Sequence, residues 1–216
     1  MVLMAALCTL RSMARSAHGW RLSWWLWLGL LASRLMAADV AALFTSKVRY
    51  ELDCTTGVLW KVGDAATPLS YTLLPQIITL KIPPIHEWSL AEGTLVFRSR
   101  FSLLLEPIVR GPEHYYLGLA AAGELEWRSR SQRFAAFFAS GGGFGWMDSK
   151  GYEISGAQGQ DFNLNWLIHS GVRYRTNQEW QWSLGLYFQH ISNKGMNQVN
   201  PGLNALGPTL SLSRLF

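Results

Sequence analysis

A histidine and a serine two positions apart, His190 and Ser192, are the strongest candidates for chemistry in this chain. If both lie on one face of a strand, their Cα atoms are roughly 6.5 Å apart. At that separation an imidazole nitrogen can approach a serine oxygen, which places a base next to a nucleophile. The alternative is structural: the strand leaves the apolar layer here, and its polar side chains lie among lipid headgroups.

The segment 179–189 precedes this pair and must position it. Its even-numbered residues are large and apolar, and its odd-numbered residues are mostly polar or small: Trp180, Trp182, Leu184, Leu186 and Phe188 against Glu179, Gln181, Ser183, Gly185, Tyr187 and Gln189. Because successive side chains of a strand point to opposite faces, the pattern predicts a strand with one apolar face. His190 and Ser192 continue the apolar parity, where a polar pair is costly unless it has a function or is covered.

The same alternation recurs along the chain and predicts eight strands, at 47–61, 71–82, 95–110, 114–128, 133–146, 161–175, 179–191 and 205–216. The connections 129–132 and 176–178 are short, whereas 147–160 and 192–204 are long. An even number of strands, with short turns at one end and long loops at the other, is typical of bacterial outer-membrane barrels.

Alternation alone also fits a soluble lipid-binding barrel, in which the apolar face would turn inward. Aromatic residues make up 13% of the chain and lie at the ends and along the apolar parity, as in the aromatic girdles of membrane barrels. The chain ends on Phe216, which resembles the terminal assembly signal of outer-membrane proteins, although Arg214 breaks the apolar parity. The predicted fold class is therefore an all-β, eight-stranded antiparallel transmembrane β-barrel.

Residues 1–38 have the layout of a cleaved secretory signal peptide, which leaves 39–216 as the barrel domain. Basic residues precede a short apolar run, and small residues follow it, with cleavage after Ala38 or Ala42. The run is shorter than the ~20 residues of a spanning helix, which argues against a membrane anchor. Four of the 19 basic residues and none of the 14 acidic ones lie in this leader. The rest of the chain therefore has 15 basic against 14 acidic residues, and no basic stripe remains to bind nucleic acid.

Other polar residues have structural explanations. His169 lies on the polar parity and is predicted to be a hydrogen-bonded interior histidine. Charged residues of opposite sign also face inward, where ion pairs inside a narrow barrel are expected: Arg98, Arg100, Glu124 and Glu126. With Cys8 in the leader, Cys54 alone offers neither a disulfide framework nor a cysteine metal site.

The segment from His190 to Asn204 resembles the active-site region of the PagL-type lipid A 3-O-deacylases. These enzymes are eight-stranded barrels that hydrolyse an ester-linked acyl chain of lipid A with a Ser-His-Glu triad on the outer surface, without a metal or other cofactor. The resemblance implies that His190 is the general base and Ser192 the nucleophile. It also implies that Asn200 and the main-chain amide of Lys194 stabilise the oxyanion, with help from Asn193.

One position departs from the family's pattern. The acid expected fourteen residues after the histidine is Asn204, and an amide cannot offer the charge that stabilises an imidazolium. It can still accept a hydrogen bond and select the tautomer; in a serine protease the corresponding change costs about four orders of magnitude in rate. Three outcomes stay open: a dyad of low activity, an acid supplied by the loop 147–160, from Asp148 or Glu153, and an inactive enzyme.

Two functions follow from these observations. The first is an outer-membrane esterase that acts on lipid A of lipopolysaccharide, with Ser192 facing the lipids that surround the barrel. The second is a non-catalytic outer-membrane barrel that binds lipopolysaccharide or has a structural role, for which Asn204 is the best support. The sequence leaves open which acyl chain is cut and whether two copies associate as a homodimer.

Overall fold

The computed structural model describes residues 50–64 and 66–216, which form one β-sheet without helices. The predicted signal peptide, both cleavage sites and the start of the first predicted strand lie outside the described residues. The strands are β1 (Glu51–Gly57), β2 (Leu59–Lys61), β3 (Thr72–Leu73), β4 (Gln76–Lys81), β5 (His86–Leu90), β6 (Gly93–Arg110), β7 (Tyr115–Ser129), β8 (Phe134–Met147), β9 (Phe162–Arg175), β10 (Trp180–Ser192) and β11 (Leu203–Leu215).

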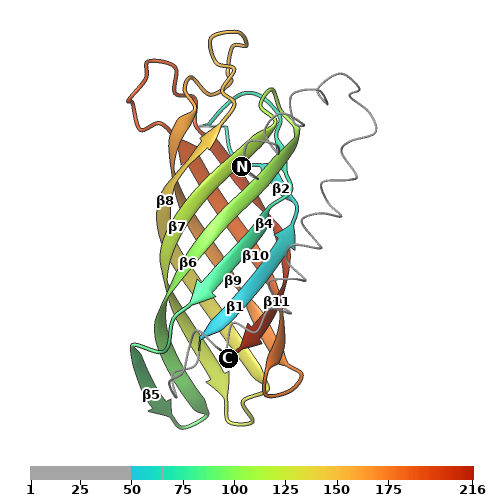
Figure 1. The fold of residues 1–216 in the computed structure, drawn as a ribbon, viewed down its shortest axis with the longest axis vertical. Coiled ribbons are helices and arrows are strands. Elements are labelled where there is room, and N and C mark those ends of the chain that lie inside the picture. Colours follow the sequence, from blue (N-terminus) through green and yellow to red (C-terminus); the bar gives the residue numbers. More distant parts are fainter. Residues whose placement is uncertain (1–49, 65) are drawn as a thin grey trace, which may run out of the picture. The chain divides into compact units, whose positions relative to one another are not determined.

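Pairing between neighbouring strands closes the sheet into a barrel (Figure 1). β1 and β2 follow one another along β11, and β3 and β4 follow one another along β6, so each of these pairs makes one barrel strand. The pairing of β1 with β11 joins the first barrel strand to the last, and every pairing is antiparallel. The predicted eight-stranded antiparallel barrel is therefore confirmed.

Two of the predicted strands are interrupted. Val58 separates β1 from β2, beside Gly57, where a Cβ atom would lie 2.5 Å from the main-chain oxygen of Pro208. Only glycine fits so close an approach to β11. Leu74 and Pro75 separate β3 from β4, because a proline has no N–H to contribute to a ladder.

The connections differ in two places from the predicted pattern. β5 is an additional strand that pairs only with β6, at the end of the barrel that holds the C-terminus (Figure 1). All its residues are exposed, so its sequence has no alternation to reveal it. At the opposite end, where long loops were expected, the connection 111–114 between β6 and β7 is as short as the turns. The long loops at that end are 62–71, 148–161 and 193–202.

The two faces of β10 are divided as the sequence predicts. Leu184 is 60% exposed on the outside of the barrel, whereas Gln181 and Gln189 are 4% and 0% exposed inside it. Exposed apolar side chains outside and buried polar ones inside are the reverse of a soluble barrel, so the alternative of a soluble lipid-binding barrel is wrong. Within the described residues, no helix is long and apolar enough to cross a membrane.

A network of ion pairs fills part of the barrel interior. Arg98 contacts Glu124 at 3.1 Å and Glu126 at 2.9 Å, Arg173 contacts both carboxylates, and Arg100 contacts Glu124 at 3.2 Å. These side chains are at most 3% exposed, and charges so deeply buried need partners of opposite sign. The ion pairs predicted between inward-facing residues are confirmed, and they tie β6, β7 and β9 together.

Candidate active site

His190 lies between two polar side chains on the outer surface of the barrel. Its Nδ1 is 2.6 Å from Oδ1 of Asn204, and its Nε2 is 2.9 Å from Oγ of Ser192. An amide oxygen can only accept, so Nδ1 carries the proton and Nε2 of the neutral ring is an acceptor. The Ser192 hydroxyl therefore donates to Nε2, which is the arrangement of a base that activates a nucleophile.

The strands set this geometry through parity and register. His190 and Ser192 share the outward face of β10, and His190 pairs directly with Asn204 of β11. All three side chains are half-buried, and Ser192 is the last residue of β10. The sheet thus brings together residues that are fourteen positions apart in the sequence, at the end of the barrel opposite the C-terminus (Figure 1).

An aromatic side chain of the neighbouring strand lies beside the histidine. Trp166 of β9 pairs in register with His190, and the centroids of the two rings are 6.0 Å apart at an interplanar angle of 33°. Trp166 also packs against Phe188, at 4.9 Å between centroids. Sequence reasoning missed this contact, because it depends on the register between β9 and β10.

The loop 193–202 holds the three residues that the resemblance assigns to the oxyanion. Asn193 is buried, and its main-chain N–H donates to Oδ1 of Asn200 at 3.0 Å. Its side chain donates to the Val199 oxygen at 2.9 Å and accepts from the Gly195 N–H at 2.9 Å. These bonds hold the loop in shape, so the structure places the Asn193 side chain in a bracing position. Because Oδ1 of Asn200 is an acceptor here, its Nδ2 is the atom that can donate to an oxyanion.

Three positive φ angles shape the loop next to the pair, at Lys194, Gly195 and Gly202. Lys194 has a φ of 52° and an exposed side chain, so the main chain turns sharply directly after Asn193. Gly202 has a φ of +67°, and a Cβ atom there would lie 3.4 Å from Cε1 of His190. The positive φ favours glycine at Gly202, whereas a Cβ atom there would only reach van der Waals contact with the imidazole.

The loop 148–161 braces the loop 193–202. The side chain of Asn197 donates to the Gly159 oxygen at 3.3 Å and accepts from the Tyr152 hydroxyl at 3.1 Å. At the base of the same loop, the buried Glu113 accepts from the Gln158 N–H at 2.8 Å and from the Tyr71 hydroxyl at 2.7 Å. The first two bonds join the loops 148–161 and 193–202, and the Glu113 bonds join the loop 148–161 to Tyr71 at the end of the loop 62–71.

Asp148 and Glu153 of the loop 148–161 are the two acids considered as replacements for the missing triad acid, and neither contacts His190. Asp148 accepts from the main-chain N–H of His114 at 2.8 Å and lies 2.5 Å from Nδ1 of the same residue. Glu153 is exposed in a turn. Nδ1 of His190 already faces Asn204. The hypothesis that this loop supplies an acid to His190 is therefore wrong for Asp148, and no contact supports it for Glu153.

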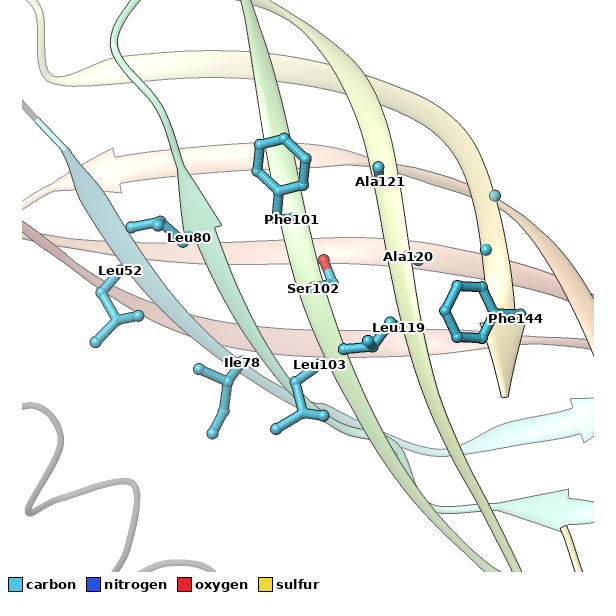
Figure 2. A pocket seen from close by; sticks show the side chains of 12 residues that line it. Leu52, Ile78, Leu80, Phe101, Ser102, Leu103, Leu119, Ala120, Ala121 and Phe144 are labelled. Atoms are coloured by element: carbon cyan, nitrogen blue, oxygen red, sulfur yellow. The ribbon is translucent and has the colours of Figure 1, made fainter. Parts of the chain in front are cut away.

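The chain also has an apolar groove, of about 500 Å³, on another part of the barrel wall (Figure 2). It lies over β1, β4, β6, β7 and β8, and large side chains such as Phe101, Leu119 and Phe144 line it. Its one hydroxyl, on Ser102, bonds to Thr79 at 2.8 Å. The groove offers no base or nucleophile, so the candidate chemistry stays at His190. Among the residues described, no cluster of three or more His, Cys, Asp or Glu side chains could hold a metal ion.

Comparison with known proteins gives a family and a fold. The crystal structure of the outer membrane enzyme PagL is similar, with a TM-score of 0.50 and 18% identity over 74% of this chain and 97% of that one. Neisserial surface protein A (NspA) is 12% identical over 79% of this chain and 96% of its own, with a TM-score of 0.42. The outer membrane protein OprG from Pseudomonas aeruginosa is 9% identical over 77% and 95%, with a TM-score of 0.37.

No curated protein sequence matches the chain. A family model described as PagL, lipid A 3-O-deacylase, matches residues 18–213. That match includes the whole segment from His190 to Asn204 and nearly all of the barrel. By this match, the chain belongs to the PagL family of lipid A 3-O-deacylases.

Proposed function

We propose that this protein is an outer-membrane esterase that removes an ester-linked acyl chain from lipid A by a Ser-His mechanism. The observation that carries the proposal is the line of hydrogen bonds from Asn204 through His190 to Ser192 on the outer surface of the barrel. The acyl esters of lipid A lie in the lipid leaflet around such a barrel. Only an outward-facing nucleophile can reach them without taking the lipid out of the membrane.

The reaction follows from the proton positions. Ser192 Oγ attacks the ester carbonyl carbon while Nε2 of His190 takes the hydroxyl proton. The oxyanion accepts hydrogen bonds from the Lys194 main-chain amide and from Nδ2 of Asn200, while Asn193 keeps their loop in place. Collapse breaks the ester bond, and the departing sugar oxygen takes the proton from His190. A water molecule, deprotonated by His190, then attacks the acyl-enzyme and releases the fatty acid and free Ser192.

Asn204 limits the rate of this reaction. It fixes the His190 ring in the productive tautomer but brings no negative charge to the imidazolium that forms in each step. A serine protease with the corresponding amide retains the geometry and turns over about 10⁴-fold more slowly. We therefore expect a slow enzyme.

Mass spectrometry of lipid A from cells that express the protein tests the proposal. We expect lipid A to lose the mass of one ester-linked acyl chain with the wild type, and to stay intact with Ser192→Ala or His190→Ala. The double variant should lose little more than either single one, because catalytic partners act as a unit. Ser170→Ala, a half-buried serine elsewhere on the outward parity of β9, is the matched control and should stay active.

A second function is favoured by Asn204: a non-catalytic barrel that binds lipopolysaccharide. If folded wild type releases no fatty acid in a detergent in which an active family member does, this second function replaces the first.

The same proposal includes export. We propose that residues 1–38 are removed as a signal peptide, that the barrel 39–216 is inserted in the outer membrane, and that two copies associate there. Amino-terminal sequencing of protein from outer-membrane fractions checks the cleavage after Ala38 or Ala42. Chemical crosslinking of the same fractions checks the homodimer.

A further inference from the structure

Trp166 is the one ring among the described aromatic contacts that packs against His190. Its indole is 45% exposed on the outer surface, and Phe188 packs on it at an interplanar angle of 43°. The angle of 33° to the imidazole is closer to parallel than to edge-on. The two rings are therefore not perpendicular, and the indole lies beside the ring that gains a proton during the reaction.

A positive charge over an aromatic face, within about 6 Å of the ring centroid, is attracted by the ring quadrupole, and tryptophan gives the strongest attraction. The centroid separation of 6.0 Å meets this distance. When the Ser192 proton moves to His190, the imidazolium has an amide on one side, where an acid would have supplied a negative charge. Trp166 lies beside the same ring, on the neighbouring strand.

We propose that Trp166 is a positioning residue that stabilises the imidazolium of His190 and thereby offsets part of the loss caused by Asn204. The inference rests on the proposed function, because the charge on His190 arises in that reaction. Phe188 holds the indole against the imidazole, and the direct pairing of Trp166 with His190 keeps the two rings in register.

Anchoring at the membrane interface is the ordinary role of an exposed tryptophan in a barrel, and the chain contains a matched control for it. Trp146 of β8 is also 45% exposed. It packs on Phe144 and Phe162 at 5.6 and 5.5 Å between centroids. A variant at Trp146 therefore removes an equally exposed indole without touching His190.

The test is steady-state kinetics of acyl release from purified lipid A by the folded full chain in detergent. Trp166→Leu should lower kcat about two- to fivefold, the range expected for one exposed cation–π contact, and leave KM unchanged. Trp166→Phe should keep part of kcat because an aromatic face remains. Trp146→Leu should leave both constants unchanged. Gel mobility of unheated samples verifies that each variant is folded.

A second comparison separates charge stabilisation from packing. In the Asn204→Glu background a carboxylate carries the charge, so Trp166→Leu should cost less in kcat there than in the wild-type background. Equal losses in both backgrounds, or a change in KM alone, overturn the inference and leave the esterase intact. Equal effects of the Trp166 and Trp146 variants overturn it as well. A wild type that releases no fatty acid overturns the proposed function, and the role of Trp166 with it.

Discussion

Two histidines of adjacent strands, His169 on β9 and His190 on β10, have opposite surroundings. His169 points into the barrel, is 1% exposed, and lies 3.0 Å from the Thr209 hydroxyl and 3.4 Å from Nη1 of Arg100. A guanidinium only donates, so Nδ1 of His169 accepts and its proton is on Nε2. In His190 the proton is on Nδ1, and Nε2 accepts from Ser192.

The difference shows that strand parity decides whether a histidine lies in the barrel interior or at the candidate active site on the outer face. The His169 ring is enclosed by Phe137 and Tyr187, and the Arg100 guanidinium lies beside it. The predicted interior histidine with satisfied hydrogen bonds is confirmed. His190 instead has a hydroxyl proton within reach, an indole beside it and access to lipid. Hydrogen bonds and ion pairs in the interior join the strands of the barrel, and the candidate active site lies on the outer face.

Among the substitutions that test this comparison of His190 with His169, Asn204→Glu should have the largest effect. A carboxylate facing Nδ1 of His190 should stabilise the imidazolium and raise kcat, by up to about 10⁴-fold if the ring geometry is kept. Single-turnover release of fatty acid from lipid A measures it. Gln198→Glu places a charge at an exposed position of the neighbouring loop 193–202 and should change little. A fall in activity with Asn204→Glu would mean that the longer side chain displaces His190 from Ser192.

Glu124→Ala should affect the interior alone. It removes the carboxylate that Arg98, Arg100 and Arg173 all contact and leaves only Glu126 to bridge Arg98 and Arg173. Breaking a buried network of this kind costs about 3–5 kcal/mol of folding stability. Urea unfolding in lipid vesicles measures the loss, and the kcat of the folded fraction should stay unchanged. Glu179→Ala, at an exposed turn, should shift stability by less than about 0.5 kcal/mol. Loss of activity without loss of stability would show that the interior takes part in the chemistry.

Leu184→Arg tests the apolar outer face that surrounds the site. Leu184 is 60% exposed on β10, and an arginine near the middle of the membrane costs about 2–4 kcal/mol. The same vesicle unfolding assay applies. Leu90→Arg, on the exposed strand β5, is the control and should cost less than about 1 kcal/mol near the interface. Equal costs at the two positions would contradict the membrane location of β10.

The pair of His114 and Asp148 gives the smallest expected effect. Partial burial raises the pKa of Asp148, but the hydrogen bonds from His114 outweigh it and hold the pKa below its ordinary value. The carboxylate therefore stabilises the loop above the ordinary aspartate pKa, and this stability is lost as the pH falls through the lowered value. In Asp148→Asn this loss of stability at low pH should be absent, and the substitution should cost less than about 1 kcal/mol of stability at neutral pH. Thermal unfolding against pH, with Asp64→Asn as an exposed control, measures it; identical profiles for wild type and Asp148→Asn would refute the linkage.

Alternation along each strand was enough to predict much of this molecule. Period two is a local property, so Leu184 outside, Gln189 inside and His190 with Ser192 on one outward face could all be read from single segments. The breaks at Val58 and Pro75 and the strand β5 were missed. The break at Val58 depends on the close approach of Gly57 to β11, and the break at Pro75 on the N–H that proline lacks. The strand β5 is exposed on both faces, so no alternation marks it.

The residues by themselves determined the barrel, its closure by an even number of strands, and a histidine beside a serine on the outer face. Only the tertiary structure decided what surrounds that pair. Asn204 contacts Nδ1, Trp166 lies beside the ring, and Asp148 contacts His114. Each of these contacts joins two strands or loops, and their register depends on packing around the whole barrel, which no single segment encodes.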